Sequence, residues 1–187
     1  MAPQRELSDL AAVRTMAHPR RQQIMRYLAA QRSGTSAELA RALDLNTGAT
    51  SYHLRELARH GFVEEVPEPG GGRQRRWQAV ANDFRFPGRS RQDADLRAAV
   101  DEVTRQSFAG DVDALMRWLS EGSGEWADTV PYSRSTLGVT VEEFRAFFEE
   151  YIALVDKYAR RGEELPAEAR TVAVRFLAYP VGEEGTP

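Results

Sequence analysis

Two short helices joined by a tight turn constrain the fold of this chain more than any other feature. The stretch GTSAELARAL places Thr35 three residues before Glu38, a capping box that satisfies two free N–H groups at a helix start. After a short connection, Asn46 is a good N-cap for a second helix over 47–60, and Gly61 is a typical stop signal. This spacing predicts a helix-turn-helix motif.

Further elements are predicted on both sides of this motif. Apolar residues recur at helical spacing over 8–17, and Pro19 suits the first turn of another helix over HPRRQQIMRYLAAQ. Downstream, FVEEV and RQRRWQAV each read as strands, with PEPGGG between them as a turn. A hairpin directly after a helix-turn-helix is a wing, so we expect a winged helix-turn-helix domain.

The second helix of the motif presents two different faces. Its predicted inner face carries Thr50, Leu54 and Leu57. The residues left on the outer face near its N-terminus are hydroxyl-bearing, aromatic or basic: Thr47, Gly48, Ser51, Tyr52 and Arg55. Such motifs insert this end of the helix into the major groove, where hydroxyl and guanidinium groups can hydrogen-bond to phosphates or base edges. The alternative is that these residues are helix caps and solvated surface.

The order of these segments resembles the winged helix-turn-helix of the ArsR-type bacterial transcription regulators, over about residues 8–82, and SYHLRELARHGFV is its most specific part. The resemblance implies a homodimer that binds double-stranded operator DNA, usually as a repressor released by a signal. It also implies the DNA-binding residues, which are Thr47, Gly48, Thr50, Ser51, Tyr52 and Arg55 on the helix and Arg73, Arg75 and Arg76 on the wing. The alternative for the three wing arginines is an edge strand defended by charge.

Composition excludes several kinds of chemistry. The 187 residues include no cysteine, so there is no disulfide, thiol nucleophile or thiolate metal site, although many ArsR-type regulators sense metals through cysteines. His53 and His60 are seven residues apart, about 10 Å along a helix, and His18 stands alone. We therefore expect no metal and no cofactor. We expect His53 to pack or hydrogen-bond beneath the recognition helix.

Charge divides the chain into unlike halves. Residues 1–90 carry 14 Arg against 9 Asp or Glu, a balance of +5, and residues 91–187 carry 11 Lys or Arg against 19 Asp or Glu, a balance of −8. A basic half beside an acidic half indicates that one end meets a polyanion. No apolar run reaches the length of a membrane span, and the N-terminus has charges where a signal peptide needs apolar residues, so we expect a cytoplasmic protein.

The acidic half is predicted to dimerise. Apolar residues from 92 to 120 advance in threes and fours, which indicates one long helix. We expect Leu96, Val100 and Val103 to form a seam between two subunits, the alternative being that this helix lies on its own domain. A second capping box at Thr140 then opens an aromatic-rich helix.

The end of the chain is predicted to complete a small α/β unit. RTVAVRFLAYP alternates like a strand, and YSRSTLGV could be its partner. The aromatic residues of this half, among them Trp118, Trp126 and Tyr132, could line a pocket for a small-molecule effector or simply form a core. The paired carboxylates of this half would point in different directions from a helix, and no histidine lies beside them. We therefore expect no catalytic activity.

Together these features predict an α+β, mainly α, chain in three parts. Residues 1–82 form the winged helix-turn-helix domain, 83–91 a linker, and 92–187 a dimerisation and possible ligand-sensing domain made of a long helix and a small α/β unit. The expected function is a homodimeric DNA-binding transcription regulator that acts as a repressor on an inverted-repeat operator. The alternative is a winged helix that contacts RNA or protein, with a small-molecule-binding C-terminal domain.

Overall fold

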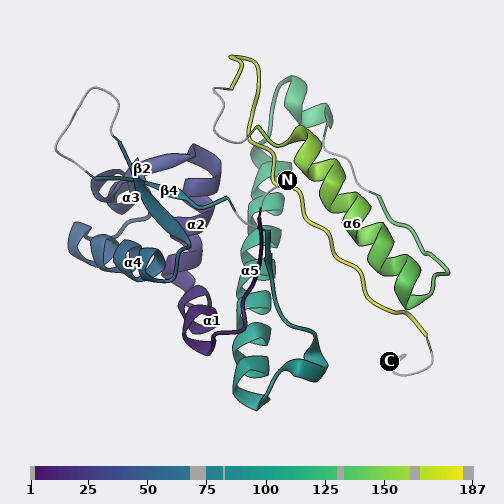
Figure 1. Ribbon diagram of the computed structural model, residues 1–187. Helices are drawn as coiled ribbons and strands as arrows, with labels where there is room; N and C mark the ends of the chain where they lie inside the picture. Colours follow the sequence, from purple (N-terminus) through teal and green to yellow (C-terminus); the bar gives the residue numbers. More distant parts are fainter. Residues whose placement is uncertain (1–2, 68–74, 82, 130–132, 161–164, 183–187) are drawn as a thin grey trace.

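The computed structural model describes residues 3–67, 75–81, 83–129, 133–160 and 165–182 (Figure 1). The fold is α+β and mainly helical, as predicted. In chain order the elements are β1 (Gln4–Glu6), α1 (Leu10–Met16), α2 (Pro19–Gln31), β2 (Ser33–Thr35), α3 (Ser36–Ala42), α4 (Thr47–Arg59), β3 (Val63–Val66), β4 (Arg76–Ala79), β5 (Asp83–Arg85), the 3₁₀ turn η1 (Arg89–Arg91), α5 (Ala94–Glu121), the 3₁₀ turn η2 (Glu125–Thr129) and α6 (Val141–Tyr158).

The helix-turn-helix forms through the caps that the sequence predicts. At the start of α3, Thr35 Oγ1 accepts the Glu38 N–H at 3.2 Å, while Glu38 Oε2 accepts the Thr35 N–H at 2.8 Å. At the start of α4, Asn46 Oδ1 accepts the Ala49 N–H at 2.7 Å. A side-chain cap of this kind contributes about 1 kcal/mol to stability, so these residues fix where both helices begin.

A three-stranded antiparallel sheet closes the domain, in the order β2-β4-β3. The predicted hairpin of β3 and β4 is confirmed, with Glu65 opposite Trp77 in the ladder. The third strand, β2, was not predicted; it places Gly34 opposite Trp77 on the other side of β4. Because β2 runs directly into α3, this pairing ties the first helix of the motif to the wing.

One apolar core fills the N-terminal half. Its fully buried members come from four helices and from the loop before β3: Val13, Ile24, Leu28, Leu39, Leu54, Leu57 and Phe62. Thr50, Leu54 and Leu57 all have no exposed surface, which confirms the predicted inner face of α4. The outer face of α4 is therefore left to solvent.

The long helix α5 belongs to this same core along its first half. Leu96, Val100 and Val103 are 6–7% exposed and pack with the apolar residues of the N-terminal half, next to α1. The expectation that these residues form an exposed seam between subunits is therefore corrected, because the chain's own core already covers them. Figure 1 shows the winged domain on one side of α5 and α6 with the C-terminal segment on the other.

The C-terminal half contains no strand in the parts that the structure describes. Residues 171–180 are extended, but side chains rather than a β-ladder hold them: Phe176 packs against Tyr151 of α6 with ring centroids 4.8 Å apart, and Arg175 pairs with Asp111 of α5. The expected partner segment, 133–140, runs along the opposite side of α6 (Figure 1). The prediction of a small α/β unit is therefore wrong, because α6 separates its two strands.

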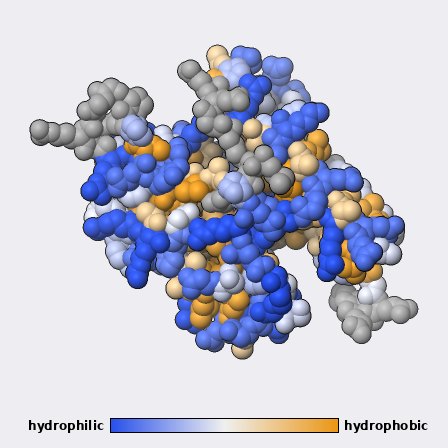
Figure 2. Space-filling view, in the orientation of Figure 1, coloured by the Kyte–Doolittle hydropathy of each residue, from blue (hydrophilic) through white to orange (hydrophobic). Residues whose placement is uncertain are grey.

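The predicted aromatic helix is confirmed as α6, including its capping box at Thr140 and Glu143. No residue of α6 is buried, and an ion pair links the helix to β5. Arg85 of β5 forms a two-pronged ion pair with Glu149, which raises the pKa of the guanidinium and lowers that of the carboxyl. Figure 2 shows apolar surface among the polar residues of this half. None of the described helices combines the length and apolarity needed to cross a membrane.

Candidate nucleic-acid interface

The outer face of α4 carries the polar residues that the sequence singles out. Thr47, Gly48, Tyr52 and Arg55 are exposed and Ser51 is partly exposed. The Arg55 side chain folds back along the helix, and its Nε donates to the Ser51 carbonyl at 3.2 Å. Among the described residues, one exposed hydrogen bond holds the guanidinium, so it can turn toward a ligand at small cost.

Thr50 does not belong to this face. Its side chain is fully buried, and its Oγ1 donates to the Asn46 carbonyl at 3.0 Å. A residue with no exposed surface cannot contact DNA. The expectation of a DNA contact for Thr50 is therefore corrected, and the residue instead steadies the first turn of α4.

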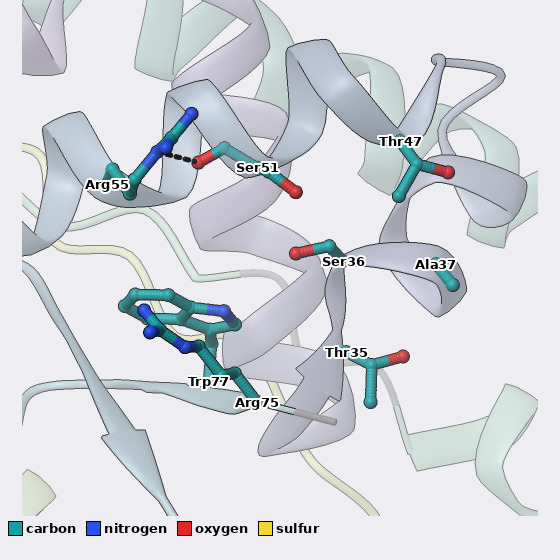
Figure 3. A pocket seen from close by; sticks show the side chains of 8 residues that line it. All are labelled: Thr35, Ser36, Ala37, Thr47, Ser51, Arg55, Arg75 and Trp77. Carbon is teal, nitrogen blue, oxygen red and sulfur yellow. Dashed lines mark hydrogen bonds between the residues drawn. The ribbon is translucent and has the colours of Figure 1, made fainter. Parts of the chain in front are cut away.

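An open groove of about 350 Å³ lies between α4, the start of α3 and the wing. Its lining residues are Thr35, Ser36, Ala37, Thr47, Ser51, Arg55, Arg75 and Trp77. In Figure 3, Ser51 and Arg55 lie on one side of this groove, Arg75 and Trp77 on the other, and Ser36 between them. The groove thus joins residues more than 40 positions apart into one surface that includes two cations.

Arg75 is the wing cation best placed for a ligand. Its side chain is 70% exposed, and its Nη1 pairs with Glu65 Oε1 on β3 at 2.9 Å. An exposed ion pair of this kind contributes little to stability, so a phosphate can replace Glu65 as the partner at small cost. Arg73 lies outside the described residues.

Arg76 is part of the fold rather than of the groove. Successive side chains of a strand point to opposite faces, so Arg76 turns away from Arg75. Its Nη2 donates to Glu38 Oε1 at 3.1 Å, and the side chain is only 21% exposed. The pKa of Glu38 is lowered, chiefly by the hydrogen bond from the Thr35 N–H and further by Arg76. The expected DNA contact of Arg76 is corrected accordingly: this residue joins β4 to the capping box of α3.

Two histidines meet beneath the outer face of α4. The rings of His18, at the start of α2, and His53, on α4, lie 4.8 Å apart between centroids, and His53 also contacts the ring of Tyr52 at 5.5 Å. His53 is buried, in agreement with the packing role predicted for it. The contact with His18 was missed, because residues 35 positions apart give no local signal. Among the described residues, no three metal-ligating side chains gather into a metal site.

Sequence reasoning also missed the lining residues outside α4. Ser36 and Ala37 belong to the first helix of the motif, and Trp77 is buried at the base of the groove. The capping box shows where α3 begins. Only the packing of α3 against α4 and the pairing of β2 with β4 bring that start to the groove.

Comparison with known proteins agrees with this architecture. A family model described as a helix-turn-helix domain matches residues 16–66. These residues form a helix-turn-helix domain. Among curated proteins, none matches the chain. The family match and the fold described above both indicate a helix-turn-helix domain in this part of the chain.

Several solved structures are similar to the chain. A transcriptional regulator homologue from Pyrococcus horikoshii OT3 is 23% identical over 54% of this chain and 87% of that one, with a TM-score of 0.33. A variant of ZitR from Lactococcus lactis in its apo form is 13% identical over 76% and 84%, with a TM-score of 0.35. A MarR family transcription regulator is 18% identical over 80% and 83%, with a TM-score of 0.33.

The role of Arg76 can be tested by unfolding. Arg76→Ala removes the ion pair with Glu38 and should lower the free energy of unfolding by about 1 kcal/mol at pH 7. Because the pKa of Glu38 is lowered in the fold, its contribution is present above its usual pKa and is lost as the pH falls through the folded value, so the difference should shrink in acid. Urea unfolding at pH 7 and pH 3.5 measures both effects. Arg75→Ala is the matched control and should change stability by less than about 0.5 kcal/mol; equal losses in the two variants would contradict the assignment.

Proposed function

We propose that this chain is a sequence-specific regulator of transcription that binds double-stranded DNA through α4 and the wing. The observation that carries the proposal is the groove, where the exposed face of α4 meets Arg75 of β4 and the start of α3. A helix about 10–12 Å across fits the major groove of B-DNA, which is about 12 Å wide. The residues that remain as proposed DNA contacts are Thr47, Gly48, Ser51, Tyr52 and Arg55 on α4 and Arg75 on the wing, with Arg73 beyond the described residues.

The chemistry of the groups in this site suggests which residues would contact phosphates and which would contact bases. Arg75 lines the wing side of the groove, where the phosphate backbone would pass, and phosphate contacts fix position without reading sequence. Tyr52 and Arg55 project from α4 itself, where base edges would lie. We therefore propose that the wing supplies affinity and α4 supplies sequence preference.

The repressor role is proposed from the resemblance to ArsR-type regulators, in a cytoplasmic protein with no cofactor. The proposal includes no effector site. The aromatic rings of α6 pack on Phe176 at centroid distances of 4.8–6.4 Å, and Tyr132 lies outside the described residues. The alternative partners, RNA or another protein, are distinguished by competition with duplex RNA of the same sequence.

The proposed regulator acts as a homodimer, and the second half of α5 supports this. Phe108, Val112, Leu115 and Leu119 are spaced four, three and four residues apart, as in a two-helix seam, and are 41–60% exposed. At about 100° per residue, this stripe is rotated about 120° from the buried face of Leu96, Val100 and Val103. It therefore points away from the chain's own core, and a second copy would cover it. The two winged domains could then contact an inverted repeat.

The DNA-binding proposal is tested by Arg55→Ala. The fold should persist, because Arg55 is exposed and, within the described residues, its side chain bonds to a carbonyl of its own helix. If Arg55 reads a base edge, discrimination at one position per half-site should fall by about 1–3 kcal/mol. Binding is measured against a selected duplex, its single-base variants and random duplex DNA. Arg41→Ala, which removes an exposed charge outside the groove, is the matched control. Wild-type binding and discrimination in Arg55→Ala would remove the main support for the proposal.

The dimer proposal is tested by Leu115→Asp. Wild-type protein should sediment as a dimer, whereas this variant should give folded monomers, because a seam would bury an unpaired charge. Ala114→Asp, exposed and away from the stripe, should remain dimeric. Val100→Asp should unfold rather than dissociate, since Val100 lies in the core. A folded Leu115→Asp variant that stays dimeric would rule out this seam.

A further inference from the structure

We propose that the contact between His18 and His53 makes DNA binding by α4 sensitive to acid. Uptake of a proton by this pair displaces the start of α2 from α4 and weakens binding. The inference rests on the proposed DNA-binding function and adds to it a means of regulation. It is carried by the geometry at the start of α2 and the middle of α4, where His18 and His53 meet beside Tyr52.

His18 can cap the start of α2 only while its ring is neutral. It is the N-cap of α2, and its Nδ1 accepts the Arg20 N–H at 3.2 Å. An acceptor nitrogen has a free lone pair, whereas both ring nitrogens of a protonated imidazole are donors. Protonation at Nδ1 therefore removes the cap. It also places a cation at the positive end of the helix dipole, which disfavours that charge.

A second ring proton on His53 would also be unfavourable. It is 9% exposed, and its Nδ1 is buried without a hydrogen-bond partner. A charge added there would be buried with no acceptor to stabilise it. The ring also contacts the rings of His18 and Tyr52, so we expect that separating α2 from α4 would relieve the charge.

The charged groups around the pair act in the same direction. Arg20 and Arg21 of α2 face both rings, and Tyr52 is the titratable side chain in contact from α4; no carboxylate is among the interactions recorded for the pair within the described residues. Arg21 cannot swing away freely, since it is buried and its Nη1 donates to the Thr15 carbonyl at 3.4 Å. Burial first, and these cations next, lower the pKa of His18. For His53, burial is again first, followed by His18 and then the two arginines.

The pH range follows from the direction of these shifts. In the unfolded chain a histidine takes up its proton near pH 6.5, above the lowered folded values. The stabilising contribution of the neutral pair is therefore complete above pH 6.5 and is lost as the pH falls through the folded pKa values. Neutral solution thus favours the arrangement in which α2 and α4 are packed together.

The pair is coupled to the proposed interface through Tyr52. This side chain is 51% exposed on the outer face of α4, and its ring meets His53 edge-on. A displacement of His53 therefore moves a side chain that is proposed to contact DNA. His60, the third histidine, lies at the far end of α4 beside Asp9 and serves as an internal control.

The experiment compares three forms of the full chain at pH 7.5 and pH 5.0, at constant ionic strength. The probe is a duplex selected from random sequences by the wild-type protein at pH 7.5. Wild type and His60→Asn should bind it at least about tenfold more weakly at pH 5.0 than at pH 7.5, a difference that corresponds to about 1.4 kcal/mol. His18→Asn keeps a side-chain cap but cannot be protonated, so it should lose less than about threefold. Circular dichroism at both pH values checks that each form remains folded.

NMR titration of the imidazole protons gives a reading that does not depend on DNA. The ring protons of His18 and His53 should titrate below pH 6.5, and His18→Asn should change the titration of His53. Equal acid sensitivity in wild type and His18→Asn, or a rise in affinity in acid that His18→Asn abolishes, would overturn the inference; the second result would mean that His18 contacts phosphate. Absence of duplex binding at pH 7.5 would instead contradict the proposed function.

Discussion

The burial of one face of α4 is the constraint on which the rest of this structure depends. Leu54 and Leu57 have no exposed surface, and the hydroxyl of Thr50 is satisfied within the first turn. Each buried leucine contributes about 1.5–3 kcal/mol, enough to fix the rotation of the helix about its axis. Once the inner face is set, Ser51, Tyr52 and Arg55 can only point outward. The proposed reading surface is thus a consequence of core packing.

The wing is joined to this helix pair through a polar link. Arg76 connects β4 to Glu38, which also closes the capping box of α3. Because alternate residues of a strand face opposite ways, holding Arg76 inward turns Arg75 toward the groove. Glu38 and Arg76 therefore fix the start of α3, hold β4 in place and orient Arg75 toward the groove. Beyond the winged domain, the attachment of α6 depends on exposed ion pairs such as that of Arg85 with Glu149.

Local patterns predicted those parts of the fold that are determined locally. The capping boxes at Thr35 and Thr140, the cap at Asn46 and the β3–β4 hairpin each depend on residues close in sequence, and all are confirmed. Contacts between residues far apart in sequence could not be predicted from local patterns. These are the β2 pairing at Gly34, the groove position of Ser36 and the ring contact of His18 with His53. The alternation of residues 171–180 led to the wrong prediction of a strand. Such alternation indicates an extended segment with two different faces, but it does not show that a neighbouring strand is present. The apolar spacing of Leu96, Val100 and Val103 showed a buried face without showing what covers it.

The central claim is that the surface joining α4 to the start of α3 and β4 contacts duplex DNA. Hydrogen–deuterium exchange with and without a selected duplex tests it most directly, because backbone protection reports on each segment of the intact chain. We predict slower exchange over residues 35–39, 47–56 and 75–79, and no change over 141–158. Protection confined to α6 and residues 171–180, or none at saturating duplex, would contradict the account.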